Sequence, residues 1–329
     1  MNRISLLLLV VLLAACAGPS PAPHLGSTPG SAPIQSAPTA QTPPTQPEAA
    51  QPPSAATQAL VPTSAERAAT ESSAQTGLKS VEYAGVSFQY DSSLAKQVNA
   101  ETKPAFIQES GYIVDTVPQR VVFTFNDPYT SQGVFAGLSP ANYPWQAHQL
   151  VENPDPWAAR PQIFIFPVEE FVQSNPDAGQ ETSDLAAVLF GADPASLDEL
   201  PALPLFPCRQ SVRAGIRPVG FENGQGIRYL AACYQDASPV VNPNLYYSFQ
   251  GLTNDGQLYV AAYFPVYAPV LPDAPPDLSD MDAWMLAYPD YLQETNQALD
   301  TTPDSQFTPD LALLDSLVQS LSLTWQPSP

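Results

Sequence analysis

The sequence contains few of the residues that catalysis and metal binding require. It has two histidines: His24 lies in a proline-rich segment, and His148 stands alone in the rest of the chain. A multi-histidine metal site is therefore excluded. A Ser-His-Asp triad would depend on His148, and no G-x-S-x-G motif supplies its serine. We interpret His148 as a loop or core residue and assign no catalytic residue, cofactor or metal ligand.

Basic residues are also scarce. The chain has 11 Lys and Arg against 32 Asp and Glu, with a formal net charge of −21, and no basic residue follows Arg228. Nucleic acid is excluded as a partner because phosphate contacts need clustered cations. An anionic membrane surface would repel the chain for the same reason. The acidity indicates solubility or, alternatively, a cationic ligand.

A hydrophobic run long enough to cross a membrane is missing. The longest mainly apolar run, residues 4–15, has 12 residues and is interrupted only by Ser5, whereas a spanning helix needs about 20. Arg3 precedes this run, and Leu13, Ala14, Ala15 and Cys16 end it. A basic start, a short apolar core and a small-residue exit are typical of a secretory signal peptide.

The exit tetrapeptide resembles the lipobox of bacterial lipoproteins, a resemblance that covers residues 1–16. It implies removal of residues 1–15 and lipidation of Cys16, whose acyl chains would hold the protein on a membrane. Ala17, rather than Asp, follows, so no inner-membrane retention signal is expected. We predict a lipid anchor in the cell membrane or outer membrane, with the head outside the cytoplasm. The alternative is an ordinary signal peptide cut after Ala15.

The segment after Cys16 is predicted to be a tether. Residues 17–78 contain 12 prolines and no Phe, Trp or Tyr. Such a segment cannot bury enough apolar surface to offset its chain entropy, so we expect disorder over 16–78. The first aromatic residue is Tyr83, and a globular head is predicted over 79–329.

Two cysteines remain after Cys16, namely Cys208 and Cys233. In an oxidising compartment they are expected to form a disulfide. The bridge would close a loop of about 25 residues, worth roughly 3–4 kcal/mol in the chain-entropy model. The alternative is a pair of buried thiols, because the residues before Cys233 also have a core-like pattern.

The head combines many alternating apolar runs with few helical patterns. Runs rich in Val, Tyr and Phe and bounded by Gly, Pro or Asn indicate strands. We predict an α+β fold, a single domain dominated by antiparallel sheet with a few packed helices. The expected strands are 81–90, 120–125, 161–168, 211–221, 227–234, 245–252 and 257–266; the expected helices are 182–190, 279–298 with an interruption at Pro289, and 308–321.

The two ends of the head carry a second resemblance. The stretch "YAGVSFQYDSSLA", together with a late "LLDSLVQSLSL" helix before a terminal strand, is similar to PsbP-like α/β/α sandwiches. The middle of the head departs from that pattern. The chain as a whole resembles bacterial lipoproteins with an uncharacterised head, a resemblance that implies no activity.

Two predicted hairpins suggest a ligand-binding face. Asp255-Gly256 forms the turn of one, and "NGQG" (223–226) is taken as a four-residue turn of the other. These registers leave arginines and tyrosines opposite the apolar faces. Arg suits carboxylate or phosphate, and Tyr stacks on sugars. The candidate face for an anionic or carbohydrate ligand consists of Arg213, Arg217, Arg228, Tyr246, Tyr259 and Tyr263.

The alternative for this face is that an acidic helix covers it. Asp282, Asp290 or Glu294 would then pair with the arginines inside the protein. In the same region, "DLSDMD" (277–282) lacks the spacing of a calcium-binding loop, so we interpret Ser279 or Asp280 as a helix cap.

We therefore predict a lipid-anchored cell-envelope protein whose head is a non-enzymatic binding or scaffold module. Its partners would be the membrane, through the acyl chains, and an envelope protein or an anionic or carbohydrate ligand. One alternative is a solute-binding component of a transporter, although the head lacks repeated strand–helix alternation. A second alternative is a glycan hydrolase, which would need two buried carboxylates about 5–9 Å apart in a groove.

Overall fold

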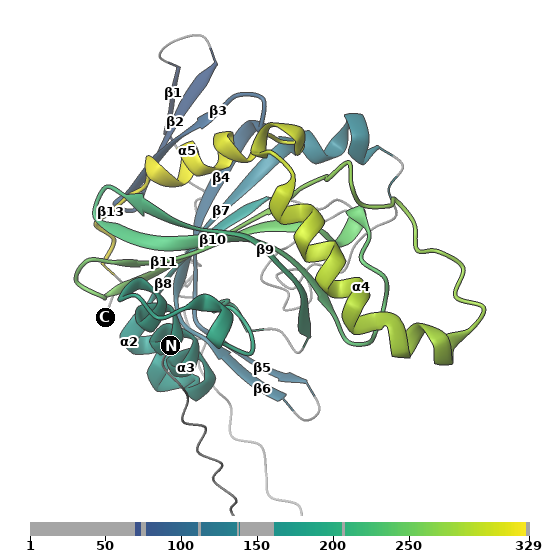
Figure 1. Cartoon of the computed structure of the whole chain (residues 1–329). Helices are drawn as coiled ribbons and strands as arrows, with labels where there is room; N and C mark the ends of the chain where they lie inside the picture. The colour runs from purple at the N-terminus through teal and green to yellow at the C-terminus, as the bar shows by residue number, and fades with distance from the viewer. Residues whose placement is uncertain are drawn as a thin grey trace, which may run out of the picture. The chain divides into compact units, whose positions relative to one another are not determined.

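A computed structural model of the chain describes residues 70–73, 77–110, 113–136, 138, 161–205 and 208–326 (Figure 1). All of them belong to one unit, Thr63–Pro329. The predicted signal peptide, the lipidation site Cys16, most of the predicted tether and His148 lie outside the described residues.

The centre of the head is a seven-stranded antiparallel sheet in the order β4-β7-β8-β12-β11-β10-β9. Its strands follow the predicted apolar runs, except β4, whose polar sequence gave no alternating pattern. The fold is α+β and dominated by antiparallel sheet. The strands are β4 (Ala95–Lys103), β7 (Arg120–Pro128), β8 (Gln162–Pro167), β9 (Arg209–Phe221), β10 (Gly224–Tyr234), β11 (Tyr246–Thr253) and β12 (Leu258–Pro265).

A smaller sheet has the order β1-β2-β3-β13. The stretch 81–90, predicted as one strand, is a hairpin, because Ala84 and Gly85 both have positive φ and form a tight turn. β1 lies within the predicted tether, so the ordered sheet begins before the expected boundary at 79. The strands are β1 (Thr70–Ser73), β2 (Leu78–Tyr83), β3 (Val86–Asp91) and β13 (Ser322–Leu323); β5 (Phe106–Ser110) and β6 (Ile113–Val117) form a separate hairpin.

The helices begin at identifiable caps. The Asn175 side chain accepts from the Asp177 N–H at the start of α3 (Pro176–Leu189), which begins before the predicted residue 182. Asp280 accepts from the Ala283 N–H and caps α4 (Met281–Thr301), as predicted. α4 continues through Pro289, so the predicted interruption is wrong. Two further α-helices are α2 (Val168–Ser174) and α5 (Leu311–Gln319), and η5 (Asp304–Gln306) is one of several short 3₁₀ turns.

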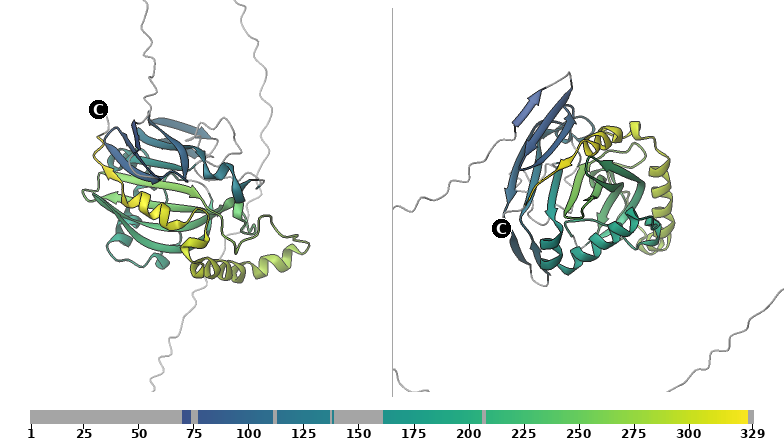
Figure 2. Two further views of the ribbon diagram at one scale, coloured as in Figure 1. Left: turned by 90° about the horizontal axis from the view of Figure 1, so that it is seen from above. Right: turned by 90° about the vertical axis from the view of Figure 1, so that its left-hand side faces the viewer.

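Helices lie on both faces of the large sheet (Figure 2). α4 packs against β9, and α5 against β9 and β3, whereas α3 packs against β10 and β11 on the other face. The small sheet shares the α5 side, where the Phe88 ring meets Phe123 edge-on with 5.1 Å between centroids. Each face therefore has its own hydrophobic core. β8, β11 and β12, at the centre of the large sheet, are buried along their whole length.

Candidate functional site

The predicted ligand face does not form, and the first reason is the register of β9 and β10. Phe221 pairs with Gly224, so the turn is Glu222-Asn223 rather than 223–226. Gly224 and Gly226 lie inside β10, where a Cβ would clash with the Phe221 ring and with the Gln250 carbonyl, respectively. These glycines therefore serve close packing between strands, not the turn.

A register shift in the same hairpin separates the arginines. Arg217 pairs with Arg228, but the pairing shifts before Leu230, next to Gly215 at φ 60°. Arg217 and Arg228 consequently point toward η5 and α5. Arg213 lies on the other side and donates to the Leu197 and Asp198 carbonyls at 2.8 and 2.9 Å.

Arg228 is the centre of an internal ion-pair cluster. Its side chain is fully buried, and Nη2 donates to both Asp304 carboxylate oxygens at 3.0 and 2.9 Å. Arg217 donates to Asp304 at 2.7 Å, and Asp315 lies 3.5 Å from the Arg228 Nε. Tyr247 donates to Asp315 at 3.0 Å. The arginines are thus neutralised internally, by Asp304 and Asp315 rather than by Asp282, Asp290 or Glu294.

The predicted tyrosines lie on the opposite face from Arg228 and are buried. Tyr246, Tyr259 and Tyr263 belong to the core under α3, where the β11–β12 register places them as predicted. Burial raises the pKa of Tyr259 and Tyr263 well above the ordinary value. The prediction that these tyrosines form a face for a ligand is therefore wrong.

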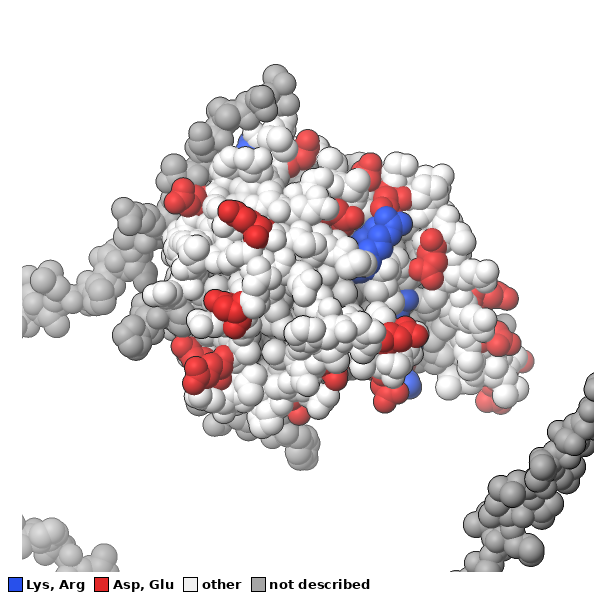
Figure 3. Space-filling view, turned by 60° about the vertical axis from the view of Figure 1, so that its left-hand side comes forward, with Lys and Arg blue, Asp and Glu red and all other residues white. Residues whose placement is uncertain are grey.

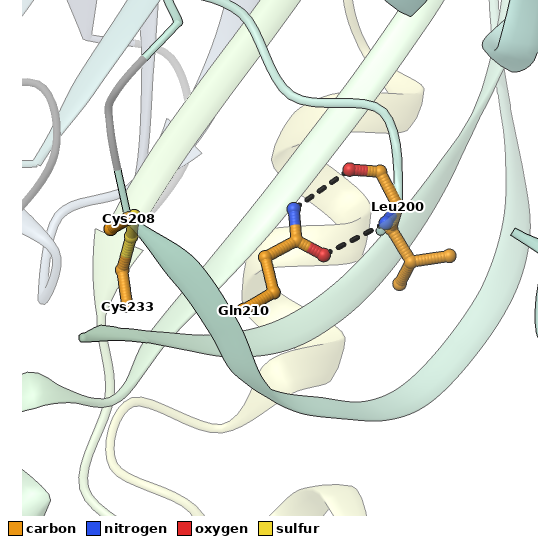
Figure 4. The surroundings of a disulfide bond; sticks show 4 residues. All are labelled: Leu200, Cys208, Gln210 and Cys233. Carbon is orange, nitrogen blue, oxygen red and sulfur yellow. Dashed lines mark hydrogen bonds between the residues drawn. A yellow bond between two sulfur atoms is a disulfide. The ribbon is translucent and has the colours of Figure 1, made fainter. Parts of the chain in front are cut away.

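The segment that covers these tyrosines is 197–205, here called the strap. Its backbone satisfies the polar side chains beneath it: Tyr229 donates to the Pro201 carbonyl at 2.8 Å, and Tyr263 to the Leu203 carbonyl at 2.6 Å. Gln210 makes two bonds with the Leu200 backbone, at 2.8 and 2.7 Å (Figure 4). Buried polar groups need such partners, so the tyrosine face is paired with the strap and not with a ligand.

The predicted disulfide is present between Cys208 and Cys233 (Figure 4). The two Cα atoms are 5.6 Å apart, within the usual range for a disulfide. The bridge joins the residue before β9 to the end of β10 and lies close to the Gln210–Leu200 pair. It therefore fixes the chain just after the strap to the central sheet.

Two carboxyl groups line a small cavity under the strap. Glu181 and Glu199 share it with Tyr246, Gln210 and the disulfide, and its volume is about 50 Å³. Ligand pockets usually measure 300 Å³ or more, roughly. The cavity has room for a few water molecules but not for a sugar ring, so it gives no support to a glycan hydrolase.

We predict that Glu181 makes stability depend on pH. Burial raises its pKa from 4.5 to about 7, and Glu199 and Asp184 add to the rise. Between pH 4.5 and 7 the folded protein keeps a proton that the unfolded chain releases. The free energy of unfolding should therefore fall as the pH rises through this window, by on the order of 2–3 kcal/mol.

The variant Glu181→Gln tests this expectation, because its amide oxygen can still accept from the Ala202 N–H at the 2.7 Å position of the carboxylate. Denaturant unfolding at several pH values should show a flatter profile than wild type and greater stability above pH 7. The control is Glu169→Gln, which changes an exposed carboxylate on α2. Parallel profiles for wild type and Glu181→Gln would contradict the prediction.

An exposed apolar surface lies on the first half of α4. Met281, Met285 and Leu286 are exposed by 55%, 54% and 84%. Together with exposed Pro289 they form a stripe along one side of the helix, here called the α4 stripe. The sequence already contained the signal, since residues 281–291 are apolar except for Asp282 and Asp290, whereas a surface helix normally has one whole face of polar residues.

The other side of α4 is anchored to the head. The Trp284 Nε1 donates to the Ala237 carbonyl at 2.6 Å, and the Tyr288 hydroxyl donates to the Ser238 carbonyl at 3.2 Å. Tyr291 accepts from the Val240 N–H at 2.8 Å. The three rings also pack on one another. These contacts fix the first half of α4 to the head, while the α4 stripe stays exposed.

A groove of about 500 Å³ runs along another flank of α4. It is bounded by the proline-rich segment 270–276 and by Tyr291, Glu294 and Ala298 of the helix. Acidic residues surround both features. Figure 3 shows red carboxylates spread over one face of the head, with the few blue basic side chains gathered on one part of it.

Comparison with known proteins identified no relative of this chain. No protein-family model matches the chain, and neither a curated protein nor a solved structure is significantly similar. The resemblances noted in the sequence therefore remain predictions.

No helix among the described residues is both long and apolar enough to cross a membrane. In the same part of the chain, no three His, Cys, Asp or Glu side chains are grouped closely enough to hold a metal ion.

Proposed function

We propose that the protein is a lipid-anchored cell-envelope protein whose head binds a partner and performs no chemistry. The observation that carries the anchor is the lipobox-like sequence Leu13-Ala14-Ala15-Cys16 at the end of a short apolar run. The Cys208–Cys233 disulfide supports it, because disulfides persist in oxidising compartments outside the cytoplasm.

Binding is favoured over catalysis by the kind of surface that the head offers. The carboxyl groups Glu181 and Glu199 line a cavity too small for a substrate. The α4 stripe, by contrast, is exposed apolar surface on a rigidly anchored helix, and such surfaces mark interaction sites. A solute-binding component would instead need a deep cleft between two lobes. The described strands form layers around one central sheet.

The anchor is tested by replacing Cys16 with alanine and following incorporation of a labelled fatty acid in a bacterial host. Wild type should take up the label and partition with membranes, and Cys16→Ala should lose both properties, since no other group accepts the acyl chains. Cys208→Ser with Cys233→Ser is the control and should keep the label. Wild type that is released without label would show an ordinary secretory signal instead.

A further inference from the structure

We infer that the α4 stripe is a docking surface for a basic amphipathic helix of another envelope protein. The inference rests on the proposed function and names the partner class of the binding head. Three observations carry it: uncovered apolar area on α4, an acidic segment 270–300 without a basic residue, and a helix that is fixed before any partner arrives.

The first observation is the uneven covering of α4. Its first half is mostly apolar, yet its hydrogen bonds to the head come from Trp284 and Tyr288. Met281, Met285 and Leu286 are left in water, with Leu286 84% exposed. Met281, Met285 and Pro289 follow one another at four-residue spacing, and Leu286 lies three residues before Pro289, so together they form a broad exposed face. An amphipathic helix packs its apolar side against a surface of this kind. Methionine suits such a surface because it adapts its shape to a partner.

The second observation is the charge around the stripe. Residues 270–300 contain seven acidic residues and no basic one. Asp277, Asp282, Asp290 and Glu294 are exposed and take part in no ion pair among the described residues. A partner that covers the stripe therefore gains from Lys or Arg at its edges, which fall opposite these carboxylates.

The same charge disfavours two other occupants. A second copy would bring an equally acidic α4 against the first, and like charges across an interface are costly. An anionic membrane surface would be repelled in the same way. A cationic helix from another protein satisfies both the apolar area and the charge.

The third observation is that α4 is fixed in place. Trp284, Tyr288 and Tyr291 donate to or accept from the backbone of residues 237–240. Farther along, the Asn296 carbonyl oxygen accepts from the Arg213 N–H at 2.7 Å, and Asp300 accepts from the Gly215 N–H at 2.6 Å. A surface fixed before binding loses little conformational entropy when a partner docks.

The test measures binding of a fluorescent helical peptide of leucine and lysine by anisotropy. The full chain is used with Cys16→Ser to remove the lipid anchor. The triple variant Met281→Gln, Met285→Gln, Leu286→Gln keeps helix propensity and charge but removes the apolar stripe. The variant Asp277→Asn, Asp282→Asn, Asp290→Asn removes charge alone. We expect each to weaken binding about tenfold or more, and added salt to weaken wild type further.

Matched controls lie elsewhere on the head. Phe190→Gln removes an equally exposed apolar side chain, 89% exposed at the end of α3. Glu169→Gln, Glu170→Gln, Asp177→Asn removes three exposed charges from α2 and α3. Ala298→Gln obstructs the groove on the other flank without touching the stripe. All three should bind like wild type.

Several results would overturn the inference. No binding, or binding that the two α4 variants leave unchanged, shows that the stripe is not the docking surface. Loss in Ala298→Gln alone assigns the partner to the groove. Tighter binding of a leucine–glutamate peptide refutes the charge argument, and α4-dependent binding to anionic vesicles makes a membrane the occupant. Failure of fatty-acid labelling removes the anchor but leaves this measurement intact, so the two proposals fail separately.

Discussion

Asp304→Ala is expected to lower the free energy of unfolding by about 3–5 kcal/mol, because it leaves a buried arginine without its main counter-charge. Arg228 is fully buried, and both hydrogen bonds from its Nη2 go to Asp304. Asp315 remains, but its nearest oxygen lies 3.5 Å from Nε. The Arg228 charge cannot reach water, and the longer ion pair with Asp315 replaces only part of what Asp304 supplies, so the folded state carries most of the desolvation cost.

Two further variants show whether the buried charge of Arg228 causes the loss of unfolding free energy in Asp304→Ala. Arg228→Met removes the charge and leaves Asp304 and Asp315 with side chains 23% and 18% exposed. Water can partly hydrate these carboxylates, so the loss should be smaller than for Asp304→Ala. Asp290→Ala changes an exposed carboxylate and should stay within about 0.5 kcal/mol of wild type. Denaturant unfolding of the full chains measures all three, and equal losses in Asp304→Ala and Asp290→Ala would contradict the prediction.

The second large effect is expected from the disulfide. Cys208→Ser with Cys233→Ser should cost about 3–4 kcal/mol of unfolding free energy, because the bridge closes a loop of about 25 residues in the unfolded chain. Reductant should destabilise wild type by a similar amount and leave the double variant unchanged. The full chain is unfolded with and without reductant, at equal concentrations. A variant as stable as oxidised wild type would show that the bridge contributes nothing.

Much of the fold followed from local sequence. Alternating apolar runs predicted every strand of the central sheet except β4, whose polar residues Lys96, Gln97, Asn99 and Glu101 hide the pattern. The turn at Asp255-Gly256 fixed the β11–β12 register, with Leu252 opposite Tyr259 as expected. Such features depend on residues that are near each other in the chain, so one stretch of sequence contains the whole signal.

The β9–β10 register could not be obtained in this way. The glycines of "NGQG" indicate a turn, but Gly224 and Gly226 are needed inside the strand for close packing against Phe221 and the Gln250 carbonyl. The register shift beside Gly215 then places Arg213 on one face and Arg217 on the other. A pattern that repeats every two residues reverses across an irregularity that the sequence does not mark.

The sequence by itself determined the composition of the head, its α+β class, the cysteine pair and the signal that predicts a lipid anchor. Only the tertiary structure decided which polar residues face water. Tyr263 can be buried because the strap supplies the Leu203 carbonyl, which lies 60 residues away in the chain. Arg228 can be buried because it pairs with Asp304, which lies 76 residues away. The partners of a buried polar group come from distant segments, and burial depends on those partners. The α4 stripe shows the opposite outcome: its side chains are apolar, yet no other segment of the described head covers them.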